Sequence, residues 1–153
     1  MLFVFDLDFT IWDAGGTWCD HTTPPYARRD AYIEDAENRI ISLFPDVLPI
    51  LERLSSEGFE VAVASRTHSP SIAKALMNLF DIQKYFSFLE IYPGSKIQHF
   101  NQLQSASNIP FREMLFFDDE QRNIDEVSQL GVKAALVHDG LSWEDLNKLP
   151  LFP

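Results

Sequence analysis

Two pairs of aspartates stand where short apolar runs end. Asp6 and Asp8 lie near the amino terminus, and Asp118 and Asp119 lie far along the chain. Carboxylates held close together repel each other unless a cation or a shared proton compensates them. Four carboxylates with few bases nearby favour Mg²⁺, because this hard cation prefers oxygen ligands in octahedral geometry. If the first and fourth strands are neighbours, these two pairs predict one magnesium site.

Hydrogen-bond donors follow two other apolar runs. Ser65 comes directly after the run 59–64, and Lys96 follows the run 88–92. A hydroxyl and an ammonium group can bind an anion that bridges to a metal, and a nearby carboxylate can act as a nucleophile. This combination of groups is typical of phosphoryl transfer.

Each of these residues has an ordinary explanation when it is considered by itself. Strand-end aspartates often cap helices or lie in solvated loops. Ser65 suits a turn, Lys96 suits the solvated start of a helix, and Arg66 can pair with a surface carboxylate. The argument for a site comes from their combination, because separate segments would otherwise have to supply matching groups by coincidence.

The segments that carry these residues alternate between strand and helix patterns. Helices are expected between the strands, ending at glycines such as Gly58 and Gly131, and Ser142 is expected to cap a last short helix. This alternation predicts an α/β fold, with a parallel sheet in a Rossmann-like three-layer α/β/α arrangement. The carboxyl ends of its strands then meet at one edge, where ligands bind. The predicted strands are 2–6, 59–64, 88–92, 113–117 and 133–138.

The segment 9–38 has no clear periodicity. A short flap hairpin is expected around Thr10–Cys19, where Trp12 and Trp18 could pack it. The predicted elements fill the intervals between the site residues, which leaves no room for a separate cap domain. We therefore expect an open cleft that makes few contacts beyond the phosphoryl group.

Composition limits the remaining possibilities. The chain has 153 residues, of which 46% are hydrophobic, so we expect a single domain over residues 1–153. One cysteine, Cys19, excludes an intrachain disulfide and a cysteine-based zinc site. The net charge of −11, without a basic run, disfavours nucleic acids and anionic membranes as partners. The sequence shows no signal peptide and no membrane-spanning run, which predicts a cytoplasmic protein.

The order of these residues resembles that of a known enzyme superfamily. The string 6–10, Asp-Leu-Asp-Phe-Thr, resembles the first motif of phosphatases of the haloacid dehalogenase (HAD) superfamily. Ser65, Lys96 and the pair Asp118-Asp119 resemble the second, third and fourth motifs. Longer strings are similar to those of the eukaryotic magnesium-dependent phosphatase subfamily: 64–67, 90–96, and 116–120 with Arg122 and Asn123.

The resemblance implies a role for each matching residue. Asp6 would be the nucleophile that forms an aspartyl-phosphate. Asp8 would be the general acid for the leaving group and then the base for the attacking water. Ser65, Arg66 and Lys96 would hold the phosphate.

The resemblance also implies how a metal ion is bound. Mg²⁺ would be held by Asp6, by the backbone carbonyl of Asp8 and by Asp119. Asp119 is preferred to Asp118 because Asn123 follows it at the usual spacing of the motif's last polar residue.

The expected activity is therefore that of a magnesium-dependent phosphomonoesterase, similar to an acid phosphatase or a protein tyrosine phosphatase. Its substrates would be phosphoproteins or sugar phosphates, between which the sequence does not choose. Superfamily dehalogenases lack the second aspartate, so Asp8 favours a phosphatase. A receiver-like module that accepts a phosphoryl group for signalling is the alternative. Such modules lack an acid at the position of Asp8, which is again evidence for the enzyme.

Overall fold

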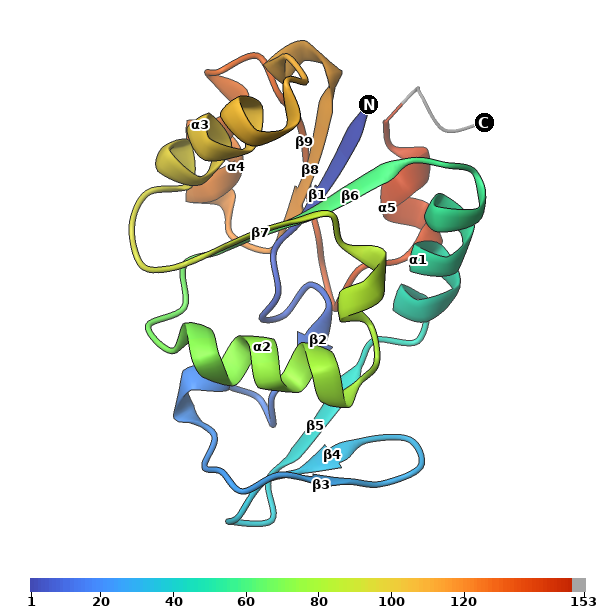
Figure 1. Cartoon of the computed structure of the whole chain (residues 1–153), viewed down its shortest axis with the longest axis vertical. Helices are drawn as coiled ribbons and strands as arrows, with labels where there is room; N and C mark the ends of the chain where they lie inside the picture. Colours follow the sequence, from blue (N-terminus) through green and yellow to red (C-terminus); the bar gives the residue numbers. More distant parts are fainter. Residues whose placement is uncertain (150–153) are drawn as a thin grey trace.

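Five parallel strands form the central sheet of the computed structural model, in the order β7-β6-β1-β8-β9 (Figure 1). The predicted α/β fold is confirmed. The structure describes residues 1–149, so the end of the domain expected over 1–153 lies outside the described residues. The strands are β1 Leu2–Phe5, β6 Glu60–Ser65, β7 Phe88–Ile91, β8 Met114–Asp118 and β9 Lys133–Leu136.

Helices cover both faces of this sheet because successive strand side chains point to opposite faces. In β1, Phe3 and Phe5 pack on one side, whereas Leu2 and Val4 pack on the other. The side of Phe3 carries α1 (Val47–Ser56), α2 (Pro70–Leu79) and α5 (Trp143–Asn147). The opposite side carries α3 (Lys96–Ser107) and α4 (Gln121–Ser128). Short 3₁₀ turns occur at Cys19–His21 (η1), Gln83–Tyr85 (η2) and Phe111–Glu113 (η3).

The helix boundaries follow the expected signals closely. Gly58, just beyond α1, has φ +78°, a left-handed conformation that glycine adopts without strain. Ser142 forms a capping box with Asp145 at the start of α5. The buried face of α1 consists of Val47, Ile50, Leu51 and Leu54, whereas Leu48 is 39% exposed. None of the described helices is long and apolar enough to cross a bilayer.

The expected flap is part of a larger insert. Trp12 does not pair within a hairpin over Thr10–Cys19, but lies antiparallel to Leu43. The insert is a second, four-stranded sheet in the order β2-β5-β4-β3, of which β3, β4 and β5 lie at the lower end of the molecule in Figure 1. Three of its strands have only two residues, which is too short for an alternating pattern to be visible in the sequence. The strands are β2 Trp12–Asp13, β3 Ala27–Arg28, β4 Ile33–Glu34 and β5 Ile40–Leu43.

The buried carboxylate of Asp35 organises this insert. It accepts hydrogen bonds from the backbone N–H groups of Thr23 (2.9 Å), Glu37 (3.0 Å) and Arg39 (2.7 Å). The Arg39 guanidinium lies 3.4 Å from Asp35 and also donates to the backbone oxygen of His21. Burial raises the pKa of Asp35, but these donors outweigh burial and lower the pKa below its usual value.

We expect Asp35→Asn to lower the free energy of unfolding by about 1–3 kcal/mol, because backbone donors lose a charged acceptor. Asp30→Asn, in an exposed turn of the same insert, is the matched control and should have little effect. Since the folded pKa of Asp35 is lowered, its contribution is complete above the unfolded value and is lost as the pH falls through the folded value. Urea unfolding at several pH values tests this; equal stability of the two variants would contradict it.

Candidate active site

The carboxyl ends of the three central strands bring the predicted residues together. Asp6 follows β1, Ser65 ends β6, and Asp118 ends β8. The register places Phe5 of β1 beside Phe117 of β8 and beside Val63 of β6, so these strand ends are level with one another. Along the sequence, the strands of the central sheet are added outward from β1 through β6 to β7. The next strand, β8, lies on the other side of β1. The site therefore lies at the point of the sheet where the strand order reverses, where ligands bind in such folds.

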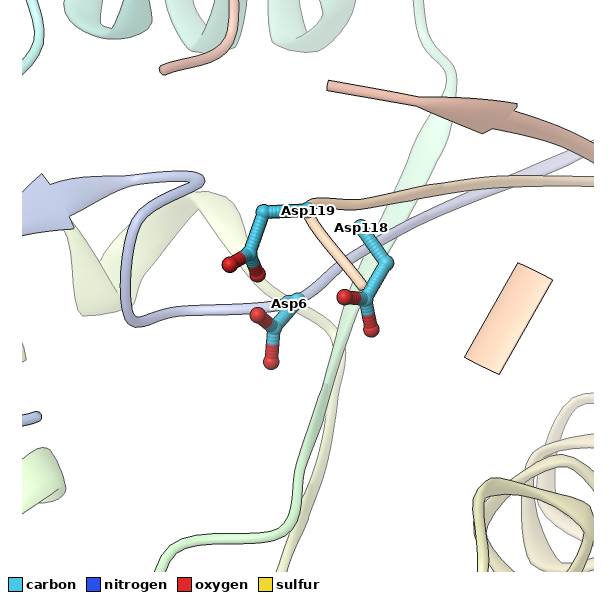
Figure 2. A group of neighbouring side chains, drawn as sticks. All are labelled: Asp6, Asp118 and Asp119. Carbon is cyan, nitrogen blue, oxygen red and sulfur yellow. The ribbon is translucent and has the colours of Figure 1, made fainter. Parts of the chain in front are cut away.

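Three carboxylates meet at this edge. Asp6, Asp118 and Asp119 each place an oxygen within 4.8 Å of the others. Figure 2 shows their side chains gathered beyond the ends of the strands. Oxygen-only donors at this spacing match the ligands that Mg²⁺ prefers, and the residues present therefore fit a magnesium ion.

Lys96 supplies a positive charge beneath these acids. Its side chain is fully buried, and its Nζ atom lies 3.0 Å from Oδ1 of Asp6 and 3.2 Å from Oδ2 of Asp118. Nζ also donates to the backbone oxygen of Ala64. Burial lowers the pKa of Lys96, but the two carboxylates outweigh burial and raise it. The lysine therefore remains an ammonium ion at neutral pH.

One lysine does not compensate three acids. Burial, followed by repulsion from Asp118, raises the pKa of Asp6 well above its usual value, although Lys96 acts in the opposite direction. Burial also raises the pKa of Asp119 to about 6. Both shifts mean that the protein without metal binds protons here more readily than free aspartates do. A divalent cation would relieve the same repulsion.

The two neighbouring acids from β8 differ in their surroundings. Asp118 is inaccessible to solvent, and its Oδ1 accepts from the backbone N–H of Glu120 at 2.8 Å. Its Oδ2 accepts from Nδ2 of Asn123 at 3.0 Å, in addition to its contact with Lys96. Asn123 in turn accepts from Arg66 at 3.0 Å. Asp119, by contrast, lines the open cleft.

Asp8 is held by the start of the insert. Its Oδ1 accepts from Nε1 of Trp12 at 2.7 Å and from the backbone N–H of Cys19 at 2.9 Å. The Trp12 ring is buried and stacks on Phe80. A tight turn joins Asp8 to Trp12, in which Phe9 takes φ +64°, a strained conformation for a bulky residue. Burial raises the pKa of Asp8, and the two hydrogen bonds oppose that shift only in part.

All six predicted site residues line one cleft of about 350 Å³: Asp6, Asp8, Ser65, Arg66, Lys96 and Asp119. Several other residues that line the cleft were not predicted from the sequence. His68 directly follows the string 64–67, so its place in the sequence could have indicated that it lines the cleft. Asp20 and His21 lie in a segment without a readable pattern. The additional residues include Asp20, His21, His68, Glu120 and Arg122.

The two tryptophans expected in the flap have different positions. Trp18 lines the cleft and is 49% exposed, whereas Trp12 is buried in the core. Cys19 is buried, and burial raises the pKa of its thiol, so it stays protonated at neutral pH. Only Trp18 of these three can therefore present a side chain to a substrate.

Comparison with known proteins gives consistent results. The chain is 44% identical over 149 residues to human magnesium-dependent phosphatase 1, covering 96% of this chain and 83% of that protein. It is 37% identical over 142 residues to a HAD-like hydrolase superfamily protein of Schizosaccharomyces pombe, covering 84% and 80% of the two chains. Among solved structures, a haloacid dehalogenase-like hydrolase from Streptococcus pneumoniae superposes with a TM-score of 0.68 at 15% identity, covering 98% and 91%.

A family model described as acid phosphatase matches residues 1–149, which is nearly the whole chain. The matched region contains every residue of the cleft. Together with the 44% identity to the human enzyme, this match shows that the chain belongs to the acid phosphatase family and is a magnesium-dependent phosphatase of the HAD superfamily.

Proposed function

We propose that the protein hydrolyses phosphomonoesters through a phosphoryl group carried transiently on Asp6. The observation that carries this proposal is the position of the Asp6 carboxylate. It lies in the cleft, 3.0 Å from the buried ammonium of Lys96, within a group of acids that suits a magnesium ion. Asp8 lies two residues further on in the same cleft, so a nucleophile and a proton donor face one substrate.

The reaction then proceeds in two steps. An oxygen of Asp6 attacks phosphorus, and the bond between phosphorus and the ester oxygen breaks while Asp8 gives its proton to that oxygen. In the second step Asp8 takes a proton from water, whose oxygen attacks phosphorus and releases Asp6 and inorganic phosphate. The raised pKa of Asp8 favours the protonated form that the first step needs.

The metal would be held by Asp6, by the backbone carbonyl of Asp8 and by Asp119. Asp119 is the better candidate of the β8 pair because hydrogen bonds from the protein already occupy both oxygens of Asp118. When bound, Mg²⁺ supplies positive charge that offsets the repulsion between the carboxylates and a phosphate dianion.

Ser65, Arg66 and Lys96 would bind the phosphoryl oxygens. Arg66 is oriented by its hydrogen bond to Asn123. Substrates would be phosphoproteins, including phosphotyrosyl proteins, or sugar phosphates. Because a residue suited to proton transfer is present at Asp8, turnover is favoured over a receiver-like role in which the phosphoryl group remains on the protein.

Activity should be lost in excess chelator and restored by Mg²⁺, while the larger Ca²⁺ should restore little. Metal affinity should weaken by at least about tenfold for each pH unit below about 6, because Asp119 and Asp6 both have raised pKa values and a protonated carboxyl group does not bind a cation. Calorimetric titration of the protein with Mg²⁺ at about pH 7 and about pH 5 measures this effect. Full activity in chelator, or an affinity that does not change with pH, would contradict the metal assignment.

Asp6→Asn should abolish turnover of para-nitrophenyl phosphate, because an amide is a poor nucleophile. Asp8→Asn should slow turnover by about 10²–10⁴-fold through loss of proton transfer. Mass spectrometry after rapid acid quenching should recover phosphate on Asp6. A covalent phosphate on another residue would overturn the mechanism.

Trp12→Phe should lower kcat by about tenfold while leaving KM nearly unchanged, because Asp8 loses one of the two hydrogen bonds that orient it. The phenyl ring keeps the contact with Phe80. Trp143→Phe is a matched control, since Trp143 packs on α1 away from the cleft. If both variants keep the kcat of the parent, the indole has no positioning role.

A further inference from the structure

The loop between β7 and α3 delivers Lys96 to the cleft. Pro93 and Gly94 of this loop line the cleft together with Lys96, which is the first residue of α3. The N–H of Tyr92, at the start of the loop, donates to the backbone oxygen of Ser65 at 3.1 Å. The loop therefore connects two of the residues proposed to bind the phosphoryl group, and whatever holds the loop also holds them.

The imidazole of His99 packs against this loop from within the protein. The residue is fully buried near the start of α3. Its Nε2 lies 2.9 Å from the backbone oxygen of Tyr92, and its Nδ1 lies 2.9 Å from that of Ser95. The ring also stacks on the ring of Tyr92, with centroids 4.3 Å apart and planes inclined by 9°. Because His99 is closed off from solvent, it cannot touch a substrate, and any effect on the reaction must pass through the residues that it holds.

A neutral imidazole has one N–H group, so it can donate to only one of these two oxygens. Burial lowers the pKa of His99, the charge of Lys96 acts in the same direction, and the hydrogen bonds to backbone oxygens oppose this shift only in part. The ring is therefore neutral at neutral pH. The oxygen of Ser95 also accepts from the backbone N–H of Gln98 at 3.0 Å, so it depends less on the ring than the oxygen of Tyr92 does. A proton on Nε2 accounts best for this difference.

The position of the loop matters because Lys96 acts over short distances. Its Nζ lies 3.0 Å from Asp6 and 3.2 Å from Asp118, so a small displacement of the start of α3 would change both contacts. A displacement of about 1 Å can slow a reaction by about 100-fold, even when the substituted residue lies away from the reacting atoms. A buried group that holds this loop can therefore affect turnover without contacting the substrate.

We propose that His99 is a positioning residue for phosphoryl transfer: its Nε2–H group donates to the backbone oxygen of Tyr92 and thereby keeps the loop and the Lys96 ammonium in place. This proposal rests on the role proposed for Lys96 above and adds the group that orients it. Tyr92 extends the effect to Ser65, because its N–H donates to the backbone oxygen of Ser65 while its own oxygen accepts from the ring.

Two amide variants test which ring nitrogen acts. In His99→Gln the amide nitrogen stands near the position of Nε2, whereas in His99→Asn it stands near the position of Nδ1. His99→Gln should therefore retain most of the wild-type kcat for para-nitrophenyl phosphate in the presence of Mg²⁺. His99→Asn should lower kcat by about 10- to 100-fold, with a smaller change in KM because Arg66 is still available to bind the phosphoryl group.

A third variant and a control separate positioning from stability. His99→Phe keeps a ring against Tyr92 but removes both nitrogens, so its kcat should match that of His99→Asn, and it also serves if His99→Asn does not fold. Ser107→Ala weakens the other end of α3, where the hydroxyl donates to the backbone oxygen of Leu103 at 2.7 Å. This control should lower the midpoint of thermal unfolding yet keep the wild-type kcat, with every variant assayed at a temperature at which it is folded.

The outcomes distinguish the positioning role from the proposed function. A wild-type kcat in either His99→Asn or His99→Phe would overturn the positioning role while leaving the phosphatase activity intact. Equal losses of kcat in His99→Gln and His99→Asn, or a loss confined to His99→Gln, would also overturn it, because the donor at Nε2 would then not be the group that matters. If Lys96→Ala keeps the wild-type kcat, or if the wild-type protein with Mg²⁺ does not hydrolyse para-nitrophenyl phosphate, the proposed function itself fails and the positioning role fails with it.

Discussion

Repulsion between the carboxylates at the edge of the parallel sheet is the interaction on which the other features of the site depend. Asp6 and Asp118 come level only because β1 and β8 are neighbours in register. The ammonium of Lys96 keeps them together because α3 begins directly beneath them. That arrangement still leaves excess negative charge, which raises the pKa of Asp6 and Asp119. A protein of this design is incomplete until a cation is bound, which agrees with its membership of a magnesium-dependent family.

The central sheet and the acids beside it were readable in the sequence for a physical reason. Strands buried on both faces produce continuous apolar runs, and parallel connections carry all their carboxyl ends to one edge. Asp6, Ser65 and Asp118 could therefore be placed together without knowledge of the side-chain geometry. The start of α3 at Lys96 was readable because Pro93, Gly94 and Ser95, directly before it, are typical of a turn that leads into a helix.

The insert could not be read in the same way. Its strands are mostly two residues long, and their partners lie far apart, as in the pairing of Trp12 with Leu43. No local pattern records such a pairing, so Trp12 was expected in a hairpin rather than in the core. The orientation of Asp8 by Trp12, and the approach of Asp20 to the cleft, follow from this tertiary arrangement and were invisible for the same reason.

The network around Asp35 has a consequence for how such an enzyme can diversify. The Asp35 carboxylate holds the insert together by accepting hydrogen bonds from backbone N–H groups of the insert, among them that of Arg39. The Arg39 guanidinium in turn donates to the backbone oxygen of His21, which lines the cleft. The anchoring groups are therefore distinct from the side chains that face a substrate. Substitutions at Trp18 or Asp20 can accumulate without loosening the scaffold that carries them. Selectivity in this architecture is open to gradual change, whereas the chemistry stays fixed in the parallel sheet.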